Sequence, residues 1–207
     1  MTIIKGDFNE VQRQQKRAAE EKRPPPHYQL HISLAFSDPL IWRRIVVSGA
    51  TTLLQLHDVL QVCMGWSGMY NHQFYVGKIF YNTTAAGRNR LYHEADHDLH
   101  SLDEAMKWCF TYIYDAGDGW EHDIVVENSF PAPEKRAYPK ALDGEWAPPP
   151  EEIRSVHEYT ALLHALENSD AGGRKAILEQ HGLEEFAPDN FDTGMLNDAL
   201  QGRLGKI

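Results

Sequence analysis

The side chains best suited to chemistry gather in one stretch of this 207-residue chain, between Tyr112 and His122. Asp115, Asp118, Glu121 and His122 all lie there. Carboxylates beside an imidazole can share a proton, hold a divalent cation or bind a polar ligand. Aspartates beside glycines also shape tight turns through their own side chains. For Asp115 and Asp118, both interpretations stay open.

Three histidines, His57, His72 and His122, fall on the apolar faces of their predicted elements. Three imidazoles that face one interior would bind a metal or exchange protons with Asp118 or Glu121. Alternatively, each is a core histidine whose nitrogens bond to a carbonyl or carboxylate. Periodicity predicts the face of each residue but not whether the faces converge, so both alternatives remain.

Residues 93–97 match the sequence His-Glu-x-x-His, in which a helix presents two zinc ligands and a glutamate that activates water. Here the segment is polar and charged, and no apolar stripe surrounds it. The sequence therefore predicts a surface loop and not a metalloprotease. Adventitious metal binding by His93, His97 and His100 is the weaker alternative.

Alternating and helical patterns predict the elements that position these residues. Apolar side chains alternate over 28–36 and again over 41–47, which is typical of strands with one buried face. Thr52 and Gln55 predict a capping box for a helix that carries His57 and ends at Gly65. The element that carries His57 thus follows directly from the pattern.

Later segments continue the series. The sequence predicts a third strand over 72–81, a polar loop over 82–100 and a short helix capped by Ser101 and Glu104. Asp115, Asp118, Glu121 and His122 then fall in a predicted hairpin over 110–127, since Asp118-Gly119 is a strong turn signal.

The last third of the chain is expected to be helical. Residues 131–150 are rich in proline and predicted to be irregular. Helices are predicted after Ser155, near 173–181 and over 193–204. Strands early and helices late indicate an α+β fold, a single domain with a largely antiparallel mixed sheet covered by helices.

The domain is preceded by a polar segment. Residues 1–26 read as a polar N-terminal arm followed by a proline linker, and residues 27–207 as the α+β domain. We expect the arm to add little to the stability of the domain, because it lacks an apolar stripe that could anchor it.

Composition limits the classes of partner. The formal net charge of −10 repels phosphate backbones, so it disfavours non-specific nucleic-acid binding. The N-terminus shows no apolar leader and no long apolar run follows, so we expect a cytoplasmic protein without a membrane partner. Cys63 and Cys109 are predicted to be buried, reduced thiols.

Two further groups of residues have alternative roles. Arg43 and Arg44 leave opposite faces of one strand, so one should face the covered side and need a carboxylate partner. The other should be solvated. Trp66, Trp120 and Trp146 would line a groove or, as dense aromatic residues more often do, fill the core.

Several motifs together resemble the plasmid pRiA4b ORF-3-like family, whose members are also described as passenger proteins of insertion elements. The motifs are Ile41-Trp42-Arg43-Arg44-Ile45, Thr52-Leu53-Leu54-Gln55-Leu56-His57, Met64-Gly65-Trp66, His72-Gln73-Phe74, Tyr114-Asp115-Ala116-Gly117-Asp118-Gly119-Trp120-Glu121-His122, Leu142-Asp143-Gly144-Glu145, Pro149-Pro150-Glu151, Tyr159, and Phe191-Asp192 to Asn197. The resemblance spans roughly residues 28–200. It implies an α+β domain whose biochemical activity is not established.

One departure from the family pattern removes a metal site. Relatives often carry three cysteines where this chain has Ala141, Pro148 and Ile153. Any zinc cluster that those cysteines build in relatives cannot form here. A function common to the family must therefore work without it.

These observations favour a non-catalytic binding or accessory domain of mobile-element origin, because no complete catalytic constellation occurs. Its polar pocket is expected near the Asp118–His122 hairpin, and its partner is a protein or a small molecule. The predicted ligand-binding residues are Asp115, Asp118, Trp120, Glu121, His122, His57 and His72. The alternative is a metal-dependent hydrolase in which His57, His72, His122 and Asp118 hold a divalent metal; no other cofactor is predicted.

Overall fold

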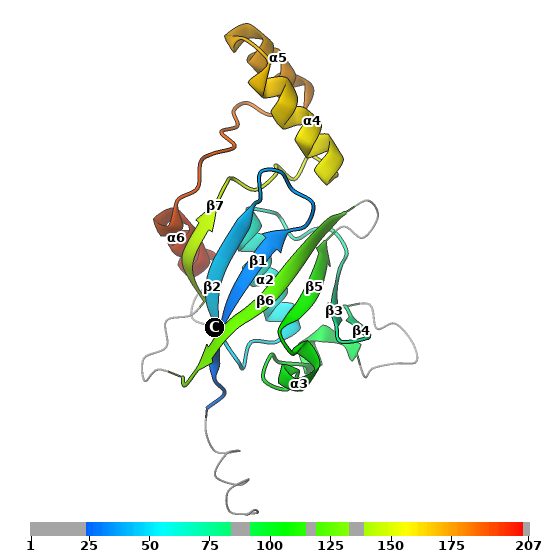
Figure 1. The fold of residues 1–207 in the computed structure, drawn as a ribbon, viewed down its shortest axis with the longest axis vertical. Coiled ribbons are helices and arrows are strands. Elements are labelled where there is room, and N and C mark those ends of the chain that lie inside the picture. The colour runs from blue at the N-terminus through cyan, green and yellow to red at the C-terminus, as the bar shows by residue number, and fades with distance from the viewer. Residues whose placement is uncertain (1–23, 84–91, 115–118, 133–138, 205–207) are drawn as a thin grey trace, which may run out of the picture.

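A computed structural model describes residues 24–83, 92–114, 119–132 and 139–204 of the protein. Within these ranges, seven strands form one sheet in the order β4-β3-β5-β6-β1-β2-β7. Each neighbouring pair is antiparallel. Together with the helices beside the sheet, this arrangement confirms the predicted α+β fold (Figure 1).

The centre of the sheet consists of β1 (His27–Leu34), β2 (Trp42–Ser48) and β6 (Trp120–Phe130). Their side chains alternate between a buried and an exposed face, as the period-2 pattern predicted. Leu30 and Ile32 are fully buried on the inner face. Leu34 stands opposite His122 in the ladder, so β1 fixes the position of the chemically interesting end of β6.

Helix α2 (Leu53–Met64) covers the inner face of the sheet and lies behind it in Figure 1. The capping box of Thr52 and Gln55 is present, and Gly65 ends the helix with φ 65°. Most of its residues are buried, His57 among them. The burial of α2 therefore places His57 between the helix and the sheet.

The predicted strand over 72–81 is two strands, β3 (His72–Val76) and β4 (Ile79–Tyr81). They are joined by a tight turn at Gly77, which has φ 65°. The prediction was wrong at this point because the inward-facing positions shift across the turn, from Phe74 and Val76 to Ile79 and Tyr81, while apolar residues also stand at the exposed positions Tyr75 and Phe80 and hide the shift. Strand β5 (Cys109–Tyr114) lies between β3 and β6, and the turn 115–118 that leads from β5 to β6 is outside the described residues.

Residues 131–150 are not irregular throughout, because β7 (Lys140–Glu145) forms an edge strand on β2. Asn197 of helix α6 (Thr193–Leu204) acts as its next neighbour: its side-chain oxygen accepts from the Ala141 N–H and its amide donates to the Ala141 carbonyl. Ala141 is the only buried residue of β7, so the strand shows no period-2 pattern of buried apolar side chains. This explains why the strand was missed.

The remaining helices are α3 (Asp103–Met106), α4 (Val156–Glu167) and α5 (Ala171–Gln180), with a short 3₁₀ turn η2 at Glu94–Asp96. Ser155 caps α4 as predicted, whereas Leu102 precedes α3 without a side-chain cap. Figure 1 shows α4 and α5 together at one end of the sheet and α6 beside β7.

Only one of the two cysteines that were predicted to be buried is buried. Cys63 is buried, but Cys109 is exposed at the start of β5, on the face of the sheet away from α2. No helix among the described residues is long and apolar enough to cross a bilayer.

Candidate functional site

Two of the three predicted histidines lie face to face on the inner side of the sheet. The imidazole of His57, from α2, stacks on that of His72, from β3, with ring centroids 3.5 Å apart and an interplanar angle of 8°. Tyr112, on the neighbouring strand β5, approaches both rings. The antiparallel register of β3, β5 and β6 brings these side chains to one place.

A short chain of hydrogen bonds sets the state of His57. The Gln61 amide donates to the Tyr112 hydroxyl over 2.8 Å, and that hydroxyl lies 2.7 Å from Nδ1 of His57. The hydroxyl is then free to donate its own proton to Nδ1, which leaves the neutral His57 ring with its proton on Nε2. Burial, with the charges of His72 and Arg203, lowers the pKa of His57 to about 3, which agrees with a neutral ring.

Glu94 is the residue that the sequence analysis missed. Its carboxylate is fully buried, and both oxygens lie 3.0 Å from Nε2 of His72. The residues 93–97 were predicted to be a surface loop, but η2 directs Glu94 inward while His93 caps it by accepting from the Ala95 N–H. A single buried carboxylate in a one-turn helix has no periodic pattern, so only the His-Glu pair itself could have pointed to it.

His122 lies in the same interior, but its neighbours are aromatic rings. It is completely buried between the rings of Trp66 and Tyr112, each 5.5 Å away between centroids. Neither ring nitrogen makes a hydrogen bond of ordinary geometry within the described ranges. Burial lowers its pKa to about 4, although the nearby backbone of Tyr112 and Trp120 favours the charged form.

The three histidines do not form a set of metal ligands. Among the described residues, no three side chains of His, Cys, Asp or Glu come together as a metal ion would require. His57 and His72 present their ring faces to each other, and a metal is bound by nitrogen lone pairs in the ring plane. Asp115 and Asp118 lie outside the described residues.

The segment after α2 closes over the stacked pair. Arg203 donates to the carbonyls of Trp66 and Ser67, while Glu151 accepts from the Ser67 N–H and hydroxyl. A methyl group on Gly68 would lie 3.5 Å from Nε2 of His57. The side chains of His72 and Glu94 are only 7% and 0% exposed, so this carboxylate–imidazole pair joins β3 to η2, and the stacking of His57 on His72 joins both to α2.

Glu121 points away from this interior, to the opposite face of β6. Its carbonyl accepts from the Ala35 N–H, which joins the hairpin to the end of β1. A groove of about 930 Å³ opens at this junction. Its lining comes from the end of β1, the hairpin and one face of α4: Ala35, Phe36, Gly119, Glu121, Ser155, Val156, His157, Thr160, Ala161 and His164.

Phe36 is the most unusual residue of this groove. It is 84% exposed and has φ 62°, a conformation that strains a bulky side chain. The backbone thus holds an aromatic ring out in solvent at the edge of a concave surface. A backbone outlier of this kind motivates the hypothesis that this surface has a functional role.

Arg43 is the buried member of the arginine pair. Contrary to the prediction, no carboxylate in the described ranges forms an ion pair with it. Its guanidinium donates instead to the carbonyls of Cys63, Trp42, Glu145 and Trp146. The Phe191 ring lies 4.2 Å from its central carbon. Burial lowers its pKa to about 10. Arg44, on the other face, pairs with Glu127.

Comparisons with known proteins agree with the resemblance in the sequence. The family model described as plasmid pRiA4b ORF-3-like protein matches residues 26–195. The uncharacterized protein y4hQ of Sinorhizobium fredii (strain NBRC 101917 / NGR234) is 27% identical over 179 residues, which cover 86% of this chain and 92% of that protein. The crystal structure of a protein of unknown function, MM3350 from Methanosarcina mazei Go1, superposes with a TM-score of 0.71 at 28% identity, over 82% of this chain and 97% of that one.

Proposed function

The chain belongs to the plasmid pRiA4b ORF-3-like family, and from this premise we propose that it is a non-catalytic binding or accessory domain of mobile-element origin. The relatives that it matches are described as uncharacterised or of unknown function, so the proposal rests on the site alone. The observation that carries it is Phe36, held strained and exposed at the edge of a large groove.

We place the ligand in the groove between the hairpin and α4. Its volume of about 930 Å³ suits a drug-sized molecule or a short peptide segment. Ala35, Gly119 and Ala161 are small and leave room for a side chain of the ligand, while Phe36 supplies an apolar contact. Glu121 offers a carboxylate, and the chain as a whole is negatively charged. A protein segment with an apolar residue and a basic residue complements this lining.

The residues predicted to bind a ligand divide between two roles in this proposal. Glu121 lines the groove directly. Trp120 and His122 flank it on β6 with their side chains in the interior, and they hold the strand in place. His57 and His72 act one layer deeper, as supports of β5 and β6. Asp115 and Asp118 lie outside the described residues and stay predicted ligand-binding residues.

The alternative of a metal-dependent hydrolase receives no support from the described residues. Its histidines stack or lie apart, and Glu94 already occupies the Nε2 edge of His72. The His72–Glu94 pair resembles a general-base arrangement. Both side chains are almost fully buried, however, so a substrate has no access to them.

Selection from a random peptide library, with the purified protein as bait, tests the proposal. We expect enriched peptides that carry an apolar residue beside a basic one. Their affinity should fall about tenfold or more for Phe36→Gly, since a buried aromatic contact is worth at least 1.4 kcal/mol. Glycine also accepts a positive φ, so this variant should fold at least as well as the parent.

Two further variants make the result specific. Ala161→Trp fills the groove from α4 and should also abolish binding, whereas Leu40→Gly removes an exposed apolar side chain from the same turn without touching the groove. The proposal fails if no peptide is enriched. It also fails if the enriched peptides bind Phe36→Gly as tightly as the parent protein.

A further inference from the structure

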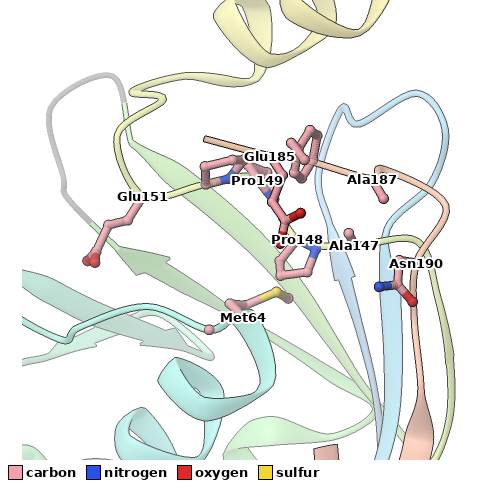
Figure 2. A pocket seen from close by; sticks show the side chains of 11 residues that line it. Met64, Ala147, Pro148, Pro149, Glu151, Glu185, Ala187 and Asn190 are labelled. Carbon is pink, nitrogen blue, oxygen red and sulfur yellow. The ribbon is translucent and has the colours of Figure 1, made fainter. Parts of the chain in front are cut away.

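A second, separate pocket lies between the end of α2, the proline-rich segment 147–151 and the segment 185–190. Its volume is about 520 Å³. Figure 2 shows its lining, in which Met64 and Pro148 stand opposite Asn190 and Ala187. None of the predicted site residues lines it, and the groove beside the hairpin shares no lining residue with it.

The walls of this pocket are apolar and held in place. Met64, three consecutive prolines and Phe186 supply most of the surface. The Ala147 N–H donates to the Pro188 carbonyl and so ties the two segments together. The indole of Trp66 donates to the Pro149 carbonyl and anchors the prolines to the core. The pocket is therefore formed before any ligand arrives.

One carboxylate, that of the exposed residue Glu185, lines the pocket without a partner among the described residues. In Figure 2 the Glu185 side chain extends between Pro149 and Pro148 at the centre of the pocket. Glu185 makes no ion pair or side-chain hydrogen bond to any residue in the described ranges. Glu151, by contrast, points away in the same view and is engaged by Tyr114 and Ser67.

The end of α2 forms one wall of the pocket. The helix terminates on the pocket wall at Met64 and Gly65, and its last turn holds no basic residue. The carbonyl end of a helix carries a partial negative charge, but two arginines already meet it here: Arg43 donates to the Cys63 carbonyl and Arg203 to the Trp66 carbonyl. The carboxylate of Glu185 alone therefore sets the sign of the ligand.

We propose that this pocket binds the guanidinium group of an arginine side chain. A planar guanidinium pairs with one carboxylate through two parallel hydrogen bonds and also stacks on an aromatic ring, which Glu185 and Phe186 offer side by side. The methylene groups of the arginine side chain lie against the prolines and Met64. The volume of about 520 Å³ accommodates one such side chain with its backbone.

Calorimetric titration with N-acetyl-arginine amide tests this assignment on the full-length protein. We expect saturable binding that weakens about tenfold in Glu185→Gln, the loss of one charge-assisted bidentate pair. Glu184→Gln removes the same charge from the adjacent residue, which is exposed like Glu185 but does not line the pocket, and should leave the affinity unchanged. The neutral isostere N-acetyl-citrulline amide should not bind.

A peptide with an internal arginine distinguishes the two sources of the group. If it binds like the free amide, the pocket recognises the guanidinium alone; if it binds more tightly, it recognises arginine within a protein partner, and both results support the proposal. Equal weakening by Glu184→Gln and Glu185→Gln would reduce the effect to net charge and overturn it. Absence of saturable binding in the parent protein overturns it as well. Because neither variant touches Phe36 or α4, the outcome is independent of the proposed function.

Discussion

Two buried histidines make the stability of this protein sensitive to acid. His57 and His122 have folded-state pKa values lowered to about 3 and about 4 from the usual 6.5. In the unfolded chain both rings take up a proton near pH 6.5, whereas in the folded protein they stay neutral. The unfolded state therefore binds more protons below this pH, and the free energy of unfolding falls as the pH decreases.

We expect that free energy to fall by about 2–3 kcal/mol per pH unit between pH 6 and pH 5, because each histidine contributes up to about 1.4 kcal/mol per unit. Urea denaturation at a series of pH values measures it. His122→Phe should reduce the slope by roughly half, since that ring makes no ordinary hydrogen bond to a described residue. His157→Gln, on the exposed face of α4, is the control and should not change the slope. A parent slope near zero would contradict the assignment of neutral, buried rings.

Single residues also show where sequence reasoning ends. Period 2 predicted that Arg43 and Arg44 leave opposite faces of β2, and they do. The partners of Arg43 could not be predicted, because three of them are backbone carbonyls from two distant parts of the chain, Cys63 and the pair Glu145-Trp146. Glu94 was missed for the same reason: the residue that it binds, His72, is distant in sequence and no local pattern links them.

At the scale of elements, the contact between β7 and the segment before α6 depends on a missing side chain. A Cβ atom on Gly144 would lie 2.6 Å from Cζ of Phe191 and 2.9 Å from the Trp42 carbonyl oxygen. The Phe191 ring would have to leave its place over the Arg43 guanidinium. Gly144 is therefore required by close packing and not by backbone conformation.

We expect Gly144→Ala to lower the free energy of unfolding by about 1–3 kcal/mol, the usual cost of overpacking a site. Gly202→Ala is the matched control in α6, where no atom lies within 4 Å of the added methyl group. It should be neutral or stabilise by up to about 1 kcal/mol, because alanine is the better helix former. Urea denaturation of both variants measures the difference. Equal stability of the two variants would show that Phe191 moves aside without cost.

Elements with their own local signals were predicted correctly. The capping box at Thr52 and the glycine after α2 are chemical marks of helix ends, and both appear where expected. Strand β7 lacks such a mark because it buries only Ala141, and the shift of the inward-facing positions at Gly77 is hidden because exposed positions beside the turn are apolar as well. The sequence therefore predicted the positions of His57, His72 and His122 but not the groove that α4 forms with the hairpin.

For the molecule as a whole, stability is expected to be unevenly distributed. Helix α2 buries nine of its residues, whereas α5, as the structure describes it, buries none and contains Gly172 and Gly173. Figure 1 shows α5 at the far end of the molecule, beyond α4. A helix with little buried apolar surface opens locally without unfolding the rest of the domain.

Hydrogen exchange followed by mass spectrometry at increasing urea concentration tests this expectation. Amides of α5 should exchange with a small free energy that hardly depends on urea, while those of α2 should exchange only on global unfolding. Helix α4 is the decisive element, because it buries Tyr159, Leu162 and Leu166 and also forms one wall of the groove. If α4 remains protected while α5 opens, the groove persists as a preformed surface. If α4 and α5 open together, the groove exists only part of the time, and ligand binding there would have to order the helix first.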